Sequence, residues 1–275
     1  MEIIGEHLDE KKEQVKKLYD NFAKEYDEIF LSGRLNLLKQ LNFYIIDSIL
    51  RKNKVHKILD AGGATGLLTE HLAKRGYDIT IIDISEKMIM KARENAQEKL
   101  AGYKDNIHFI VGDLENVTQI QDATFDFILY DGGTLSYLEH PADGLKEVHR
   151  MLKHGGIALI TAQNKYYFMG QAKSFNIGMF INRRGKVPDY MNDISVVTTC
   201  YTPKELNDLL CDCGLVVEKV GSKIVTIEFM SSVRDQLLNQ DDKYFNQVLN
   251  LEKRFLWEQS LAGVGRTLMA LCRKK

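Results

Sequence analysis

The sequence predicts an α/β fold in which a mostly parallel sheet is covered by helices on both faces. Short apolar stretches alternate with amphipathic helical patterns through the first two thirds of the chain. A glycine-rich turn, Asp60 to Gly66, follows the first such stretch and opens a helix. The chain has 275 residues, 44% of them hydrophobic, so it can bury a full core. This alternation is typical of βαβ units, whose right-handed crossovers put helices on both faces.

The first half of the chain contains two helices and then the core of the sheet. Apolar residues at steps of three and four predict a helix from 8 to about 30 and a second from 35 to 50. Ser85 is a residue type that caps helices, and it is expected to begin the helix after the second strand. We expect core strands at 57–61, 78–84, 107–111, 125–130 and 156–162, and core helices at 66–74 and 141–152.

The pattern changes after residue 163. Residues 164–200 carry many aromatic side chains without a period, which favours a lid or binding loop over an ordinary connection. Thr202, Pro203 and Glu205 then form a capping box with proline at the first helical position. That helix is expected to end at Gly214. The remaining elements are a strand at 215–227, a helical stretch at 233–260 and a final strand at 264–272.

The glycine-rich turn is the first candidate site. Glycine allows positive φ and lets backbone N–H groups approach a ligand, and the helix start adds partial positive charge. A tight strand-to-helix turn without a ligand uses the same residues. The spacing of Gly62, Gly63 and Gly66 does not match the G-x-G-x-x-G of a dinucleotide site.

Polar residues also follow the other strands. Asp83 lies 83 − 60 = 23 positions after Asp60, where an acidic residue hydrogen-bonds ribose hydroxyls; a surface helix cap is the alternative. At the third strand, Asp113 can accept from an adenine amine while Leu114 covers the ring. Tyr130 ends the fourth strand. Because ligands bind at the carboxyl ends of parallel strands, this set indicates an adenosine-containing cofactor.

These residues resemble a known family. Residues 58–66 are similar to motif I of class I S-adenosylmethionine-dependent methyltransferases, usually D-x-G-x-G-x-G. The resemblance continues through Asp83, 112–114, 125–129 and 147–156. The helix from Tyr19 to Asp27 is similar to the Y-D-x-x-A-x-x-Y-D helix of many small-molecule members. Two residues depart from the pattern, since Ala64 replaces the middle glycine and His154 a common proline.

The resemblance implies one methyltransferase domain over 1–275, with a Rossmann-like sheet of seven strands whose last strand is antiparallel. It further implies an N-terminal helical cap at 1–50, a cofactor-binding core at 55–163 and substrate-side lid insertions at 164–200 and 230–262. S-adenosyl-L-methionine is the cofactor implied. The implied cofactor contacts are Tyr19, Tyr26, Asp60, Gly62, Asp83, Ile84, Met88, Asp113, Leu114 and Tyr130. For Tyr19 and Tyr26, packing the N-terminal helix onto the domain is an equal alternative.

The implied reaction is methyl transfer to a small molecule, with nitrogen or oxygen as acceptor slightly favoured over carbon. Alignment alone supplies much of such catalysis, so no nucleophile or metal is expected. A catalytic base is unknown, and its weak candidates are His140, Tyr130 and Asp131. Arg183 and Arg184 either bind an acceptor anion or form a solvated turn. Cyclisation with the same cofactor, NAD(P)-dependent oxidoreduction and a non-catalytic partner role remain alternatives.

Composition and charge limit the partners. Lys plus Arg (37) nearly balances Asp plus Glu (38), which argues against a nucleic-acid substrate. We expect no membrane association, because no apolar run reaches the roughly 20 residues of a membrane helix. The charged N-terminus does not resemble a signal peptide, and the four cysteines lack zinc-site spacing. The sequence therefore predicts a cytoplasmic monomer or homodimer.

Overall fold

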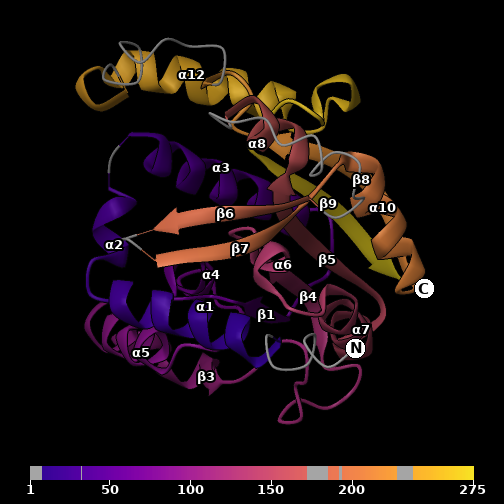
Figure 1. The fold of residues 1–275 in the computed structure, drawn as a ribbon. Helices are drawn as coiled ribbons and strands as arrows, with labels where there is room; N and C mark the ends of the chain where they lie inside the picture. The colour runs from indigo at the N-terminus through magenta and orange to yellow at the C-terminus, as the bar shows by residue number, and fades with distance from the viewer. Residues whose placement is uncertain (1–7, 32, 172–184, 192–193, 228–237) are drawn as a thin grey trace.

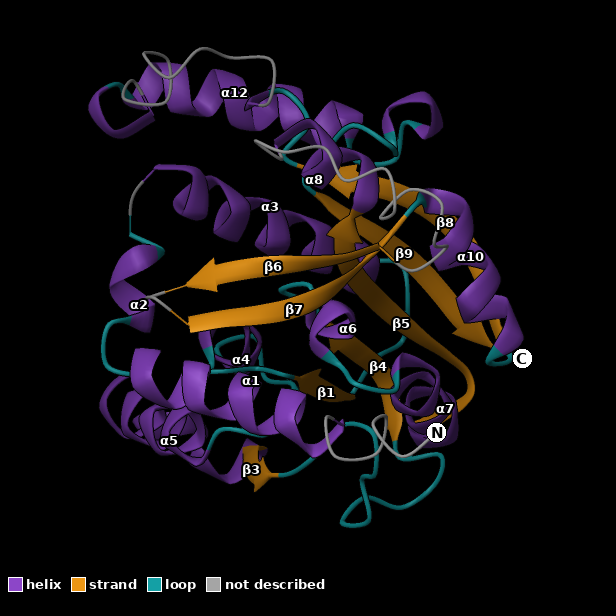
Figure 2. Cartoon of the chain, viewed as in Figure 1, coloured by secondary structure: helices purple, strands orange, loops and turns teal. Residues whose placement is uncertain are grey.

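The computed structural model describes residues 8–31, 33–171, 185–191, 194–227 and 238–275. Its centre is a nine-stranded sheet in the order β3-β2-β1-β4-β5-β7-β6, in which β9 also pairs with β5 and β8 (Figures 1 and 2). The strands that the alternating pattern predicts are β1 (Lys57–Ala61), β2 (Asp78–Asp83), β3 (Ile107–Val111), β4 (Phe125–Tyr130), β5 (Leu152–Asn164), β8 (Leu215–Lys223) and β9 (Thr267–Lys274).

The strand pairing confirms the predicted Rossmann-like topology. β1 lies in parallel between β2 and β4, and β4 continues in parallel to β5. β9 runs antiparallel to both β5 and β8, so the expected antiparallel last strand is confirmed. The carboxyl ends of β1 to β4 therefore meet at one edge of the sheet, which is where this topology binds ligands.

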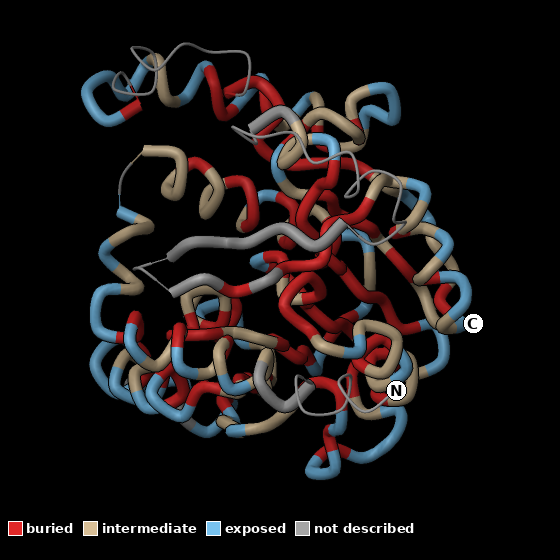
Figure 3. The backbone as a smooth tube through the Cα atoms, in the orientation of Figure 1, coloured by how far each residue is buried: buried red, intermediate tan, exposed pale blue. Residues whose placement is uncertain are grey.

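Helices bury both faces of the sheet. Ile58 of β1 joins one apolar cluster and its neighbour Leu59 joins the other, as alternation along a strand requires. Figure 3 shows buried residues along the central strands. The first cluster includes residues of α3 (Gly33–Leu50), α4 (Leu67–Ala73), α5 (Glu86–Lys99) and α12 (Asp242–Phe255). The second includes residues of α6 (Thr134–Tyr137), α7 (Pro141–Met151) and α10 (Pro203–Asp212).

The N-terminal helical region is divided. The sequence predicts one helix from 8 to about 30, but the structure has α1 (Leu8–Phe22) and the single turn α2 (Tyr26–Ile29). The residues between them turn the chain, so that α2 reaches the start of α4 while α1 lies beside α5 and β7 (Figure 1). Two short 3₁₀ helices span Ala101–Asn106 and Gln259–Leu261.

Residues 164–200 contain regular structure that the sequence did not predict. α8 (Lys165–Gln171) is followed by an antiparallel hairpin of β6 (Gly185–Met191) and β7 (Ile194–Tyr201). The end of β5 pairs in parallel with β7, which carries the hairpin past α1 and α6 (Figure 2). Arg183 and Arg184 lie outside the described residues.

The C-terminal third follows the prediction with one change. The capping box of α10 is confirmed: Thr202 Oγ1 accepts from the backbone N–H of Glu205 at 3.1 Å, and the Glu205 carboxylate accepts in return. The helical stretch expected over 233–260 is interrupted, because Asp241 caps α12, which runs from Asp242 to Phe255, while 233–237 lie outside the described residues. Among the described residues, no helix combines the length and the apolar character needed to cross a lipid bilayer.

Candidate functional site

The turn after β1 is attached to the end of β2 by backbone hydrogen bonds. The N–H groups of Gly62 and Gly63 donate to the carbonyl oxygen of Ile82 at 2.8 and 3.3 Å. A Cβ on Gly62 would lie 2.7 Å from Thr134 Oγ1, so the turn and the β4 end approach closely only because this residue is glycine. Gly62 also lines the two cavities described below, so a ligand in either can approach its backbone.

Ala64 occupies a left-handed backbone position, with φ of +47°. An L-residue with a side chain pays on the order of 1–2 kcal/mol there. Its methyl group is buried against Phe22 and Ala23 of the N-terminal region and against Met88 of α5. This packing offsets the strain, and it explains how alanine replaces the middle glycine of the family pattern.

Asp83 joins the two turns that flank it. Its Oδ2 accepts from the N–H of Ala64 at 3.0 Å and its Oδ1 from the N–H of Ser85 at 2.9 Å. The side chain lies at the cleft and is only 8% exposed, so it is no surface cap; Ser85 caps α5 through Met88, as predicted. Burial raises the pKa of Asp83 to about 6, against the lowering effect of the two backbone bonds.

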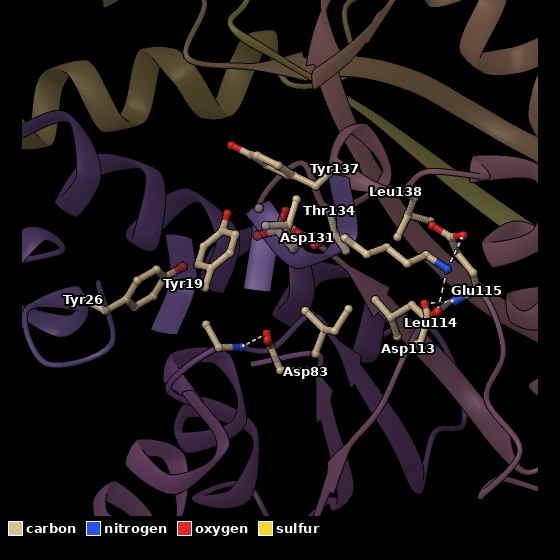
Figure 4. A pocket seen from close by; sticks show the side chains of 16 residues that line it. Tyr19, Tyr26, Asp83, Asp113, Leu114, Glu115, Asp131, Thr134, Tyr137 and Leu138 are labelled. Atoms are coloured by element: carbon tan, nitrogen blue, oxygen red, sulfur yellow. Dashed lines mark hydrogen bonds and ion pairs between the residues drawn. The ribbon is translucent and has the colours of Figure 1, made fainter. Parts of the chain in front are cut away.

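The end of β3 carries an ion cluster that the sequence did not predict. Lys12 of α1 donates to Asp113 Oδ2 at 2.7 Å and lies 3.0 Å from Glu115 Oε2. Although partial burial lowers the pKa of Lys12, these two carboxylates outweigh it and raise the pKa overall. Asp113, Leu114 and Glu115 all line the same cavity as Asp83 (Figure 4).

The end of β4 directs neighbouring side chains to opposite faces. Tyr130 follows Ile128 into the cluster beneath α7, where it is fully buried and lines neither cavity described below. Burial raises the pKa of its phenol well above the usual value. Asp131 points to the other face, toward Asn42 of α3. The sequence predicts that Tyr130 lines the cleft at this strand end. In the structure Asp131, the next residue, lines the cleft instead.

Asp131 belongs to a buried polar triangle. Lys223, the last residue of β8, donates to Asp131 Oδ1 at 2.5 Å and to Asn42 Oδ1 at 2.8 Å. The amide group of Asn42 donates to the other oxygen of Asp131. Ile224, which follows Lys223 in the chain, has φ of +61°. This left-handed backbone conformation costs a β-branched residue on the order of 1–3 kcal/mol.

The N-terminal helices form the roof of the cleft. Ser85 donates to Asp20 of α1 at 2.5 Å, and Thr65 and Asn95 donate to Asp27 of α2. These bonds fasten α1 and α2 to the rim of the core. They also bring Tyr19 and Tyr26 over the turn, as Figure 4 shows.

Two adjoining cavities result. The first has about 690 Å³ of empty space, including space open to solvent, and the second about 550 Å³. Tyr26, Gly62, Ala64, Asp131 and Gly132 line both, so the boundary between them lies where the β1 and β4 ends meet. The second cavity extends toward Leu38 and Lys39 of α3 and the start of α4.

Most of the residues predicted to contact the cofactor converge on these cavities. The first cavity is lined by Tyr19, Tyr26, Gly62, Asp83, Ile84, Asp113 and Leu114. Asp60 lines the second. Met88 and Tyr130 line neither, because both side chains are buried in apolar clusters. His140 is exposed at the start of α7 and lies outside both cavities.

Acidic groups dominate the electrostatics of the cleft. Burial, together with the nearby charges of Asp131 and Asp83, raises the pKa of Asp60 to about 7, although Thr69 donates to it at 2.8 Å. Burial and the charges around Tyr26 raise the pKa of that phenol well above the usual value. Lys39 donates to the Phe30 carbonyl oxygen, and partial burial lowers its pKa.

Several lining residues carry no signal in the sequence. Lys12 lies on a charged helix where any lysine looks solvated, and Asn42 lies within an otherwise ordinary helical pattern. Lys223 falls in a predicted strand, 92 residues from its partner Asp131. Only the tertiary fold brings these residues to the cleft.

Comparison with known proteins agrees with this geometry. The family model described as "Methyltransferase domain" matches residues 58–156. The Escherichia coli K12 tRNA 5-carboxymethoxyuridine methyltransferase is 23% identical over 93% of this chain and 95% of its own length. The Rickettsia prowazekii ubiquinone biosynthesis O-methyltransferase is 24% identical over 81% of this chain and 84% of its own.

A solved structure supports the fold over nearly the whole chain. The magnesium protoporphyrin IX methyltransferase ChlM of Synechocystis, solved with bound S-adenosylhomocysteine, matches with a TM-score of 0.61. The match covers 96% of this chain and 100% of that one, at 16% identity. The sheet order, the glycine-rich turn and the family match over 58–156 all point to the same family. The chain therefore belongs to the class I, Rossmann-like methyltransferases that use S-adenosylmethionine as cofactor.

Proposed function

We propose that the two adjoining cavities hold S-adenosylmethionine and its acceptor, and that the enzyme methylates a small molecule, at nitrogen or oxygen in preference to carbon. The convergence of Asp83, Asp113 and Asp131 from three strand ends on one cleft carries this proposal. The proposal includes a division of the chain into an N-terminal cap, a cofactor-binding core and substrate-side insertions. It also includes a protein that is a monomer or a homodimer and does not associate with membranes.

The lining residues suit the parts of the cofactor. Asp83 would hold the ribose, with Ile84 beside the adenine and Leu114 against the ring. Both oxygens of Asp83 keep lone pairs for hydroxyl donors after accepting from the backbone. The open backbone at Gly62 suits the methionine part, and Lys39 of the second cavity would pair with its carboxylate.

The residues of this chain contribute to the reaction by aligning the cofactor with the acceptor. The cofactor supplies a methyl group on a positively charged sulfur. The roof formed by α1 would restrict access of water to the cleft, and Tyr26, whose raised pKa keeps its phenol protonated, could donate a hydrogen bond to a bound ligand. Such positioning contributes on the order of 7–11 kcal/mol in favourable cases. No base is assigned, because His140 is exposed outside the cavities and Asp131 already accepts two hydrogen bonds.

The charge of the cleft supports a small acceptor. The cavities are lined by five carboxylates and two lysines, Asp60, Asp83, Asp113, Glu115, Asp131, Lys12 and Lys39. Lys12 is paired with carboxylates from the protein itself. An acidic cleft attracts a cationic sulfonium and repels a polyanion, so it favours a neutral or cationic acceptor over a nucleic acid.

A tRNA acceptor is the second candidate. The relative named for tRNA 5-carboxymethoxyuridine matches nearly the full length of both chains, including the segments outside the cofactor core. Either acceptor suits a cytoplasmic enzyme, which we propose because Cys211, Cys213 and Cys272 are free thiols.

Replacing Asp83 tests the cofactor site. We expect Asp83→Ala to weaken binding of S-adenosylmethionine and S-adenosylhomocysteine at least about tenfold, because the variant loses charge-assisted hydrogen bonds. Isothermal titration measures both affinities. Asp208→Ala, on the exposed face of α10, is the matched control and should bind like the wild type. If the Asp83 variant binds both ligands as tightly as the wild type, the ribose does not bind at Asp83.

The raised pKa values predict a pH dependence of binding. Asp83 and Asp60 lose their protons at about pH 6 and about pH 7. Their ionised forms attract a cation, so affinity for S-adenosylmethionine should rise from about pH 5 to about pH 8. Titrations across this range measure the rise, and Asp60→Asn should flatten its upper part. An affinity that falls with pH would contradict the electrostatic account.

Label transfer distinguishes the two acceptor classes. The enzyme is incubated with methyl-labelled S-adenosylmethionine and, separately, with total tRNA or a metabolite extract. We expect label in small molecules, whose identity and methylated atom mass spectrometry then gives. Label that stays with tRNA and is released by ribonuclease would establish the second candidate instead.

A further inference from the structure

The triangle of Lys223, Asp131 and Asn42 connects three distant parts of the chain at the cleft. Lys223 ends β8, Asp131 follows β4 and Asn42 lies within α3. Within the triangle, Lys223 donates to both partners and Asn42 donates to Asp131. Asp131 lines both cavities and Asn42 lines the second, so these two residues form part of the wall where the cavities meet, and Lys223 lies behind them.

Stability does not explain this arrangement. Lys223 is 1% exposed and Asp131 8% exposed, so both charges have lost most of their hydration. A buried ion pair seldom stabilises a fold more than apolar residues of similar volume would. The three groups use their donors and acceptors on one another, which is the condition under which such a pair is tolerated. A role at the cleft accounts for its presence.

The backbone after Lys223 is strained and is held in place from another segment. Ile224 has φ of +61°. The Glu252 carboxylate of α12 accepts from the N–H groups of Val225 and Thr226 at 2.9 and 2.6 Å, and from the Thr226 hydroxyl. Glu252 is fully buried. Strain that its surroundings fix in this way is characteristic of functional sites. Here it accompanies the turn of the chain next to Lys223, whose side chain reaches Asp131.

The bonding of Asp131 defines what this carboxylate can do. One of its oxygens accepts a hydrogen bond from Lys223 and the other from Asn42, and each keeps a further lone pair. Two donors, one of them an ammonium, favour the charged form of a carboxylate. We propose that Lys223 is a positioning residue that, with Asn42, fixes Asp131 as a contact for the ammonium group in the amino-acid part of the bound cofactor.

This inference rests on the proposed function of the cleft, and it assigns Asp131 a binding role in place of proton transfer. Without its ammonium partner, a buried carboxylate takes up a proton rather than stay charged. Loss of Lys223 should therefore remove the negative charge from the wall and leave the adenosine part of the site intact.

The test compares three ligands by isothermal titration. S-adenosylmethionine and S-adenosylhomocysteine carry the amino-acid part with its ammonium group, while methylthioadenosine carries only the adenosine part and a thioether. We expect Lys223→Met to weaken binding of the first two about tenfold and to leave methylthioadenosine within about twofold. Lys219→Met, an exposed lysine of the same strand, is the matched control and should bind all three like the wild type.

A spectroscopic measurement follows the charge directly. In infrared spectra of aspartate-labelled protein without ligand, Lys223→Met should show an added protonated-carboxyl band. The band should be missing from the double variant Lys223→Met/Asp131→Asn. If Lys223→Met does not fold, Lys223→Gln keeps a hydrogen-bond donor, removes the charge and should show the same selective loss of binding.

The outcomes separate the inference from the proposed function. Unchanged or tighter binding of S-adenosylmethionine by the lysine variants would overturn the positioning role. Equal weakening of all three ligands would show a merely structural role and would overturn it as well. A wild-type protein that binds none of the three would instead refute the proposed function of the cleft.

Discussion

The attachment of the glycine-rich turn to the end of β2 is the constraint on which the rest of the site depends. Backbone donors from Gly62, Gly63 and Ala64 all reach acceptors on Ile82 or Asp83. These bonds need left-handed backbone at Gly62 and Ala64, and they leave no room for a side chain at Gly63, whose Cβ would lie 2.6 Å from Ile81. They form the floor of the cleft and place Asp83 at its edge.

The roof depends on that floor. The Ala64 methyl group packs against the N-terminal region, and the carboxylates of Asp20 and Asp27 accept from Ser85 and Thr65 beside it. An N-terminal segment that looks like a separate charged helix in the sequence thus completes the cavity through Tyr19 and Tyr26. The family resemblance names these tyrosines, and the side-chain bonds show how they reach the cleft.

The sequence predicts the core sheet well because its signals are local. Strand periodicity, the glycine-rich turn and the capping box at Thr202 each depend on neighbours within a few residues. The β6–β7 hairpin was missed because its apolar and polar residues do not alternate regularly, although the β-branched residues of β7 are typical of a strand. Lys12 and Lys223 were missed because long-range ion pairs leave no mark in the sequence. Tyr130 was placed in the cleft although strand alternation, taken with buried Ile128, directs it to the core.

The central claim is that the cofactor lies along the strand ends from Asp113 to Asp131, on the floor formed by the turn. A crystal structure with S-adenosylhomocysteine tests it most directly. The account predicts the adenine at Leu114, the ribose hydroxyls on Asp83 and the amino-acid part between Gly62 and Asp131. Ligand density outside the two cavities, or an adenine far from Leu114 and Asp83, would contradict it.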